Sequence, residues 1–247
     1  IFGDNATIEY VYTGWYECTG PDHSEVLSAN DYANYPGVRP AHNLIVRNSI
    51  FASIIGTGGL ILQCDGAQIY GNIFLSLTDY PYGQNGTISC WGAQTNGSYL
   101  NHNITIANNT FVSQRAPCDC IAFLGNDLVN IVAYNNLFYN SPVGFGGCSA
   151  VDYNHFIGTD SSGGHVSTGT GNPFTAPNSL DYTLTANTSG GMNLGAPYNV
   201  DPLGNARTTW TRGAYEYDGT PAPPNENPPT ITVQPVGLTN STISAFP

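Results

Sequence analysis

The chain has 247 residues, of which 40% are hydrophobic and 12% aromatic, enough for a core in one large domain or two small ones. Five arginines and no lysine oppose 17 acidic residues, and this net charge of −12 argues against binding to nucleic acids or to anionic membranes. No apolar stretch approaches the roughly 20 residues of a transmembrane helix, and the start at Ile1 indicates a mature product or a fragment.

Helix signals are sparse, because 29 glycines and 17 prolines interrupt every long window of the chain. Only residues 24–33 predict a short helix, with Ser24 as its cap and Glu25 in its first turn. The preceding residues 6–13 alternate like a strand and have no charged or helical cap in front of them. The composition therefore predicts a protein built from strands.

Five segments share an alternation of apolar or small residues that ends in a phenylalanine. They are residues 43–51, 67–74, 103–111, 130–138 and 149–156. Four of them carry an asparagine two positions before the phenylalanine, namely Asn72, Asn109, Asn136 and Asn154. Because asparagine tolerates left-handed backbone and bonds nearby amides, it indicates a repeated turn. We expect Val46, Ile69 and Ile106 to share one interior row and these asparagines to form a ladder at a corner.

Between the repeats lies a second family of apolar segments, at residues 60–64, 87–90, 120–124 and 143–145. The phenylalanines are 23, 37, 27 and 18 residues apart, a variation that suits coils with constant strands and variable loops. The last step, into Phe156, is short for a full coil.

At these residues the chain resembles the right-handed parallel β-helix proteins of the pectin-lyase-like class, whose coils repeat an x-Ile-x-Ile-x-Asn-Asn-x-Phe pattern. The resemblance covers roughly residues 1–160. It implies an all-β solenoid of about seven to eight coils, with stacked asparagine turns.

Three further pieces follow: residues 181–184, the run Asp201-Pro-Leu-Gly-Asn-Ala-Arg207 and the run Arg212-Gly-Ala-Tyr-Glu-Tyr217. They resemble the closing piece of many bacterial surface β-helix proteins, including those that end in the domain called choice-of-anchor Q. This resemblance implies a secreted or surface-displayed protein with one β-helix domain over residues 1–218.

The C-terminal residues differ in composition from the rest of the chain. Five of the eleven residues 219–229 are proline, which predicts a stiff extended linker. Residues 230–247 resemble the first strand of an immunoglobulin-like module, and 18 residues cannot close such a sandwich. Either the chain was cut from a longer protein, or this tail pairs with the exposed sheet edge of another molecule.

Cysteines and sequons both suit an oxidising, extracellular compartment. The six cysteines are Cys18, Cys64, Cys90, Cys118, Cys120 and Cys148. Zinc is the competing interpretation, but Cys118 and Cys120 are too close for the usual spacing of a structural site. Cys64 and Cys90 each follow an apolar strand residue by two positions, so we expect them on neighbouring coils, close enough for a disulfide. The glycosylation sequons begin at Asn5, Asn85, Asn96, Asn103, Asn108, Asn187 and Asn240.

Catalytic candidates are few. A glycoside hydrolase needs two carboxylates about 5 Å or about 6.5–9.5 Å apart, and carboxylates on adjacent coils can reach these separations. The coil carboxylates are Asp65, Asp79, Asp119, Asp127 and Asp152, and we take Asp65, Asp127 and Asp152 as the catalytic candidates. A polysaccharide lyase would instead use Arg47, with calcium to hold a polyuronate against this acidic chain. Alternatively, these aspartates are turn residues at the corners of the coils, and Arg47 is a solvent-exposed residue without a catalytic role.

Aromatic residues gather in the longest step between repeats, at Tyr80, Tyr82, Trp91 and Tyr99. They would suit neutral sugar rings, or they would simply cover an open side of the helix.

The leading hypothesis is a non-catalytic structural or adhesive module outside the cell or at its surface, such as a filament subunit. We expect self-association through the helix ends or the tail, and neither nucleic-acid binding nor membrane insertion. The alternative is a carbohydrate-active enzyme, a lyase or a hydrolase. The positions of the coil carboxylates and of Arg47 distinguish the two.

Overall fold

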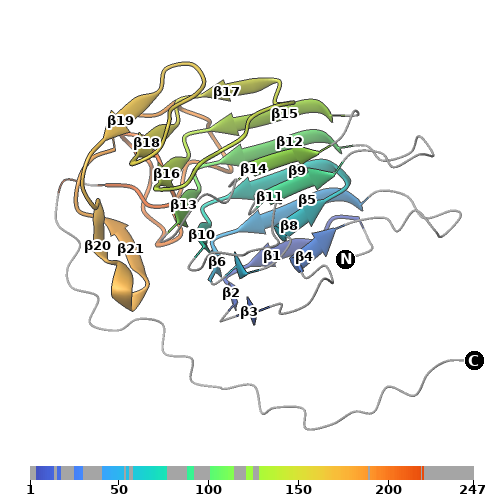
Figure 1. The fold of residues 1–247 in the computed structure, drawn as a ribbon, viewed down its shortest axis with the longest axis horizontal. Coiled ribbons are helices and arrows are strands. Elements are labelled where there is room, and N and C mark those ends of the chain that lie inside the picture. Colours follow the sequence, from blue (N-terminus) through green and yellow to red (C-terminus); the bar gives the residue numbers. More distant parts are fainter. Residues whose placement is uncertain are drawn as a thin grey trace, which may run out of the picture.

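The computed structural model describes residues 4–13, 16–17, 25–29, 41–52, 54–55, 58–76, 88–91, 101–113, 121–124, 128–188, 190–217 and 219. Within these ranges the protein is all-β, and its one helical element is the 3-10 turn η1 (Pro177–Ser179) (Figure 1). No helix of the described part could cross a membrane. The linker and the tail strand expected at 219–229 and 230–247 lie outside these residues, except Gly219.

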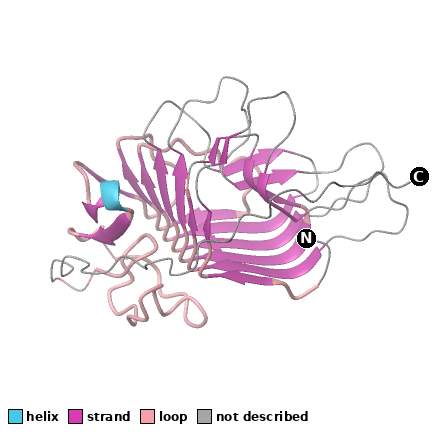
Figure 2. Cartoon of the chain, turned by 90° about the horizontal axis from the view of Figure 1, so that it is seen from below, coloured by secondary structure: helices cyan, strands magenta, loops and turns pink. Residues whose placement is uncertain are grey.

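Three parallel sheets make up most of the structure (Figure 2). The six-stranded sheet contains, in order, β1 (Thr7–Glu9), β5 (Ala41–Arg47), β9 (Cys64–Tyr70), β12 (Asn101–Ala107), β15 (Leu128–Tyr134) and β17 (Ala150–Asp152). The seven-stranded sheet runs from β19 (Ser167–Gly169) through β18 (His155–Ile157), β16 (Leu137–Tyr139), β13 (Thr110–Ser113), β10 (Ile73–Ser76) and β6 (Ile50–Phe51) to β2 (Tyr12–Thr13).

The four-stranded sheet contains β14 (Ile121–Leu124), β11 (Ile88–Trp91), β8 (Gly58–Leu62) and β4 (Glu25–Ala29). Two small sheets pair β3 (Tyr16–Glu17) with β7 (Ile54–Ile55) and β20 (Phe174–Ala176) with β21 (Asp181–Leu184), the latter antiparallel. Successive strands visit the large sheets in turn and pair in parallel with their counterparts one coil later, a solenoid-like arrangement. The short helix expected at residues 24–33 is wrong at residues 25–29, because β4 pairs there with β8.

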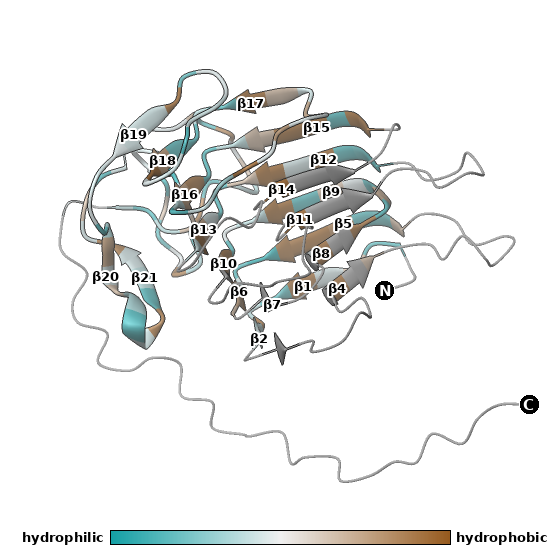
Figure 3. Cartoon of the chain, viewed as in Figure 1, coloured by the Kyte–Doolittle hydropathy of each residue, from teal (hydrophilic) through white to brown (hydrophobic). Residues whose placement is uncertain are grey.

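The interior is built from rows of identical or similar apolar side chains. Val46 lies opposite Ile69, and Ile69 opposite Ile106, so the expected row is confirmed. Five buried phenylalanine rings, Phe51, Phe74, Phe111, Phe138 and Phe156, stack with centroids 4.9–5.2 Å apart. Hydrophobic residues recur along these strands in Figure 3. The short step into Phe156 is therefore a true repeat, because its ring continues the stack.

The six- and seven-stranded sheets meet at a corner. We call each pair of consecutive strands that meets there a rung, such as β9 with β10. The first rung, β1 with β2, has no phenylalanine: Thr13 lies opposite Phe51. The last rung is β17 with β18, and β19 adds one more strand beyond it, with Thr168 opposite Phe156.

The corner between the six- and seven-stranded sheets carries the expected asparagine ladder. The backbone N–H of Asn72 donates to Oδ1 of Asn109 at 3.1 Å. Asn109 donates in the same way to Asn136 at 3.0 Å, and Asn136 to Asn154 at 2.9 Å. The left-handed residue of each turn is the one before the ladder asparagine, for example Asn108 (φ 51°) or Gly71 (φ 66°). The two consecutive corner residues thus have different roles: the first adopts the left-handed conformation that turns the chain, and the second hydrogen-bonds the neighbouring rungs.

Candidate functional site

The structure separates the carboxylates that a hydrolase would bring together. Asp65 lies near the start of β9, opposite His102, whereas Asp152 ends β17, opposite Tyr134. They are three strands apart in the sheet and at opposite ends of the strands, so about 20 Å separates them at ordinary strand spacing and rise. Glycosidic cleavage needs no more than about 9.5 Å between the two groups. Asp79, Asp119 and Asp127 lie outside the described residues.

Each described candidate already has a polar partner. Asp65 accepts a hydrogen bond from Nδ2 of Asn103 at 2.8 Å, and Asp152 contacts Nδ1 of His165 at 2.9 Å.

Arg47 lies on the outer side of the six-stranded sheet and is also bonded. Its Nε donates to Glu9 at 2.6 Å and its Nη1 to the hydroxyl of Tyr70 at 3.0 Å. Both bonds raise the pKa of Arg47, and the bond to Tyr70 has the larger effect. Since a lyase base must accept a proton, this environment works against Arg47 in that role.

The glycan platform stays a prediction. Tyr80, Tyr82 and Tyr99 lie outside the described residues, and of Trp91 only the backbone, in β11, is described.

Four of the sequons fall on described residues, and they differ in exposure. Asn5, Asn103 and Asn187 are exposed, whereas Asn108 is only 1% exposed. Nδ2 of Asn108, the atom that would carry a glycan, donates to the carbonyl oxygen of Tyr198 at 3.3 Å. The burial and this bond work against a glycan on Asn108 in the folded protein, and occupancy of the four sequons stays a prediction. Asn85, Asn96 and Asn240 lie outside the described residues.

The expected disulfide between Cys64 and Cys90 is not formed. Cys64 is a free, buried thiol in the six-stranded sheet, whereas Cys90 lies opposite Leu62 in the four-stranded sheet. The sequence alignment was shifted by two residues, since Ile88 pairs with Leu60. Burial raises the pKa of the Cys64 thiol to about 12 and that of Cys148, also free, to about 12. Among the described residues, no three His, Cys, Asp or Glu side chains are grouped to hold a metal ion.

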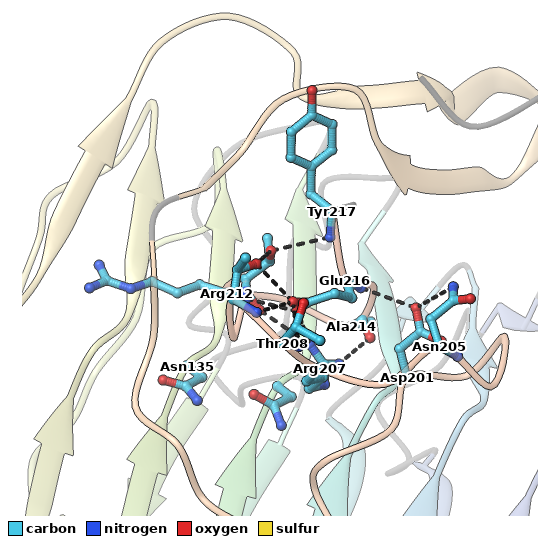
Figure 4. Close-up of polar contacts among 12 residues, drawn as sticks. Asn135, Asp201, Asn205, Arg207, Thr208, Arg212, Ala214, Glu216 and Tyr217 are labelled. Atoms are coloured by element: carbon cyan, nitrogen blue, oxygen red, sulfur yellow. Dashed lines mark hydrogen bonds and ion pairs between the residues drawn. The ribbon is translucent and has the colours of Figure 1, made fainter. Parts of the chain in front are cut away.

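The densest polar network lies in residues 190–217, which we call the closing segment (Figure 4). The carboxylate of Asp201 accepts the backbone N–H groups of Leu203 and Asn205, each at 2.9 Å, and that of Glu216 at 3.1 Å. Asp201 therefore closes a tight turn and joins it to the end of the segment.

Glu216 and Arg207 complete this network. The Glu216 carboxylate accepts the backbone N–H groups of Thr209 at 2.7 Å and Thr211 at 2.9 Å. Arg207 is buried, donates to the carbonyl oxygens of Thr211 and Ala214, and lies 3.7 Å from Glu216. Burial lowers the pKa of Arg207 to about 10, against the opposing effect of the acidic neighbours. Asp201, Arg207 and Glu216 thus all hold the backbone of their own segment.

The closing segment is fixed to the corner by the turn residues of the rungs. Asn135 donates from Nδ2 to the carbonyl oxygen of Met192 and accepts the N–H of the same residue, both at 2.8 Å. Ala214 donates its N–H to Oγ1 of Thr110 at 2.9 Å. Sequence reasoning missed this role of Asn108 and Asn135, although the Asn-Asn doublets at 108–109 and 135–136 were the available signal.

Arg212 points away from the Asp201–Glu216 network and toward the last rung (Figure 4). Its guanidinium donates to the carbonyl oxygens of Asn154 at 3.1 Å, His165 at 3.0 Å and Gly190 at 3.1 Å. It also donates to Oγ of Ser167 and lies 5.6 Å from the ring centroid of Tyr153. Burial lowers its pKa. One side chain therefore joins three separate segments.

A histidine and a serine lie together beside Arg212. Nδ1 of His155 is 2.5 Å from Oγ of Ser167, and burial, aided by Arg212, lowers the pKa of His155 to about 4. A neutral histidine on a serine hydroxyl is the geometry of an activated nucleophile. His155 is only 6% exposed, however, and the Ser167 hydroxyl also accepts from Arg212. His155 and Ser167 thus form a buried chain of hydrogen bonds that holds the Arg212 guanidinium in position.

Sequence reasoning also missed a file of alternating acids and histidines on the outer face of the six-stranded sheet. His42 lies opposite Asp65, and Asp65 opposite His102. Asp4 extends the file, since its Oδ1 lies 3.1 Å from Nδ1 of His42. The signal was available, because these residues precede the outward turn positions Asn5, Asn43, Gly66 and Asn103 by one.

Comparisons with protein-family models, with curated proteins and with solved structures found no match to this chain.

Proposed function

We propose that this chain is a non-catalytic structural or adhesive module of the extracellular space or cell surface, built as a right-handed parallel β-helix. The observation that carries the proposal is the use of its charged residues. Asp201, Arg207 and Glu216 bind backbone groups of the closing segment, and Arg212 ties that segment to the last rung. The coil carboxylates Asp65 and Asp152 are too far apart to act on one bond.

The composition supports the extracellular assignment. A chain without lysine and with a net charge of −12 resists non-specific association, and six cysteines with exposed sequons suit secretion. The resemblance of residues 201–217 to closing pieces of bacterial surface proteins points in the same direction. We further propose that the module self-associates through a helix end or the tail at 219–247.

Enzyme activity is the competing function, and a cleavage assay decides between them. The purified chain is incubated with polyuronates and with neutral polysaccharides, with and without calcium. Unsaturated products and reducing ends are then measured. We expect neither product above the level of a heat-denatured control. Cleavage that is lost in Asp65→Asn, Asp152→Asn or Arg47→Met would overturn the proposal and identify the catalytic residue.

Light scattering on the purified chain, with and without residues 219–247, tests the second half of the proposal. Concentration-dependent association supports a scaffold. A chain that remains monomeric in both forms and cleaves a polysaccharide is instead an enzyme.

A further inference from the structure

The first rung carries a run of exposed apolar residues, which we call the Tyr10–Tyr12 patch. Tyr10, Val11 and Tyr12 are 69%, 38% and 42% exposed, and they are consecutive in the chain. They supply half of the large hydrophobic residues that are exposed in the described part of the protein. Such a patch on a soluble protein usually marks a contact surface.

The first coil, which contains the first rung and β4, presents the ends of three sheets. β1, β2 and β4 are the terminal strands of the six-, seven- and four-stranded sheets, and among the described residues each pairs with a neighbour on one side. A terminal strand is a template for pairing with another strand. A surface that matches several strand edges at once is best supplied by another coil end.

The ladder geometry excludes a simple continuation of the stack. The N–H of Val11 donates to Oγ of Ser49 at 3.1 Å, so Val11 occupies the ladder position of the first rung. Valine has no side-chain acceptor, and a further rung in the same register would leave its corner N–H without the bond that Asn109 or Asn136 provides.

The opposite end of the six-stranded sheet is closed. Gly164 donates its N–H to the carbonyl oxygen of Val151 at 2.9 Å and accepts the N–H of Tyr153 at 3.1 Å. Arg212 occupies the carbonyl oxygen of Asn154 at the adjoining corner. These contacts argue against head-to-tail stacking of copies through the six-stranded sheet and its corner, because such stacking needs both ends open.

Two carboxylates at the first-rung end have partners within each copy. Asp4 lies 3.1 Å from His42, and Glu9 forms an ion pair with Arg47 at 2.5 Å. The charge of Glu9 is therefore balanced by Arg47 within each copy, and Asp4 is held by His42.

We propose that the first rung binds the first rung of a second copy across a two-fold axis, so that the Tyr10–Tyr12 patches cover each other. The inference rests on the proposed self-association and names the end and the symmetry through which it occurs. A two-fold contact uses one patch twice and closes at a dimer.

Sedimentation equilibrium over a wide concentration range tests this inference on the 247-residue chain. Tyr12→Lys and Val11→Lys place a charge on the edge, a device that blocks strand pairing. We expect each to weaken the dimer by at least about tenfold. Val129→Lys is the matched control, because Val129 is 50% exposed on β15, away from the first rung. Circular dichroism confirms that the variants fold.

The outcomes separate this inference from the proposed function. A dimer that survives both edge variants but is lost on removal of residues 219–247 refutes the first-rung contact and keeps the scaffold. Open-ended assemblies larger than dimers refute the two-fold symmetry. A chain that is monomeric at every concentration overturns the inference together with the proposed self-association.

Discussion

The guanidinium of Arg212 donates to the backbone carbonyl oxygen of Asn154 at 3.1 Å. The closing segment is thereby bonded to the last residue of the buried asparagine ladder. Asn154 is the last amide of a ladder that begins at Ser49, where the N–H of Ser49 donates to Asn72. The residues that resemble a closing motif therefore act at the corner on which the repeats depend.

Replacing Arg212 with methionine should lower the free energy of unfolding by about 3 kcal/mol, since carbonyl oxygens of three segments, that of Asn154 in a buried bond, lose a charged donor. Urea denaturation measures the change. Arg47→Met is the control, because its ion pair with Glu9 is exposed and should be worth less than about 1 kcal/mol. Equal losses for the two variants would contradict the role of Arg212.

Replacing Asn109 with leucine should cost about 3 kcal/mol or more. The side chain accepts from Asn72 and donates to the carbonyl oxygens of Ile69 and Ala107, all in a buried corner. Asn130→Gly is the comparison, because Asn130 is exposed, has a φ of 55° that glycine adopts readily, and should change stability by under about 1 kcal/mol.

Stability should fall as the pH is lowered through the window from about 6.5 to about 4, in part because of His155. Its pKa is lowered to about 4 in the folded protein by burial and by Arg212. The unfolded chain therefore binds a proton that the folded chain refuses, and folding loses stability as the pH falls. His155→Gln should remove this part of the pH dependence. An identical pH profile for the variant, measured by denaturation at several pH values, would refute the assignment.

Asn108 should remain unmodified when the chain is secreted from a glycosylating host. Its Nδ2 is bonded to Tyr198 beneath the closing segment, whereas Asn187 is exposed. Glycosidase treatment in heavy-oxygen water, followed by peptide mass spectrometry, reports occupancy at both sites. A glycan on Asn108 of the folded protein would mean that the closing segment does not cover this corner.

Cys64 and Cys148 should resist alkylation in the native protein and react after denaturation. Burial raises the pKa of each thiol to about 12, and the reactive species is the thiolate. Peptide mapping after iodoacetamide treatment, without reduction, follows both residues. Rapid native labelling of Cys64 would place it at the surface.

The repeats were readable in the sequence because they use two strong local signals. Alternating residues such as Ile69 and Ile106 mark the interior, and the ladder asparagines mark the corner. The first rung escaped recognition because Tyr10 and Val11 replace the Asn-Asn doublet and Thr13 replaces phenylalanine. Ser24 and Glu25 favour the start of a helix locally, but the pairing of residues 25–29 with β8 outweighs that preference.

The candidate site was less accessible to sequence reasoning. The alignment of Leu62 with Ile88 was off by two residues, because Ile88 pairs with Leu60. Cys90 therefore lies opposite Leu62, whereas Cys64 already belongs to the six-stranded sheet. The separation of Asp65 from Asp152 depends on which end of a strand each occupies, and the motif spacing does not encode that. The bonds of Arg212 join segments far apart in the chain, so no local pattern announces them.

Because the corner bonds fix each rung to the next, the chain can change length elsewhere without losing its alignment. Successive ladder asparagines are 37, 27 and 18 residues apart, yet the hydrogen bonds between them differ by only 0.2 Å. Foreign peptides could therefore be inserted between two rungs as displayed loops while the neighbouring strands keep their pairing. In evolution, the same tolerance would let the loops diverge in length and sequence while one hydrogen-bonded edge preserves the fold.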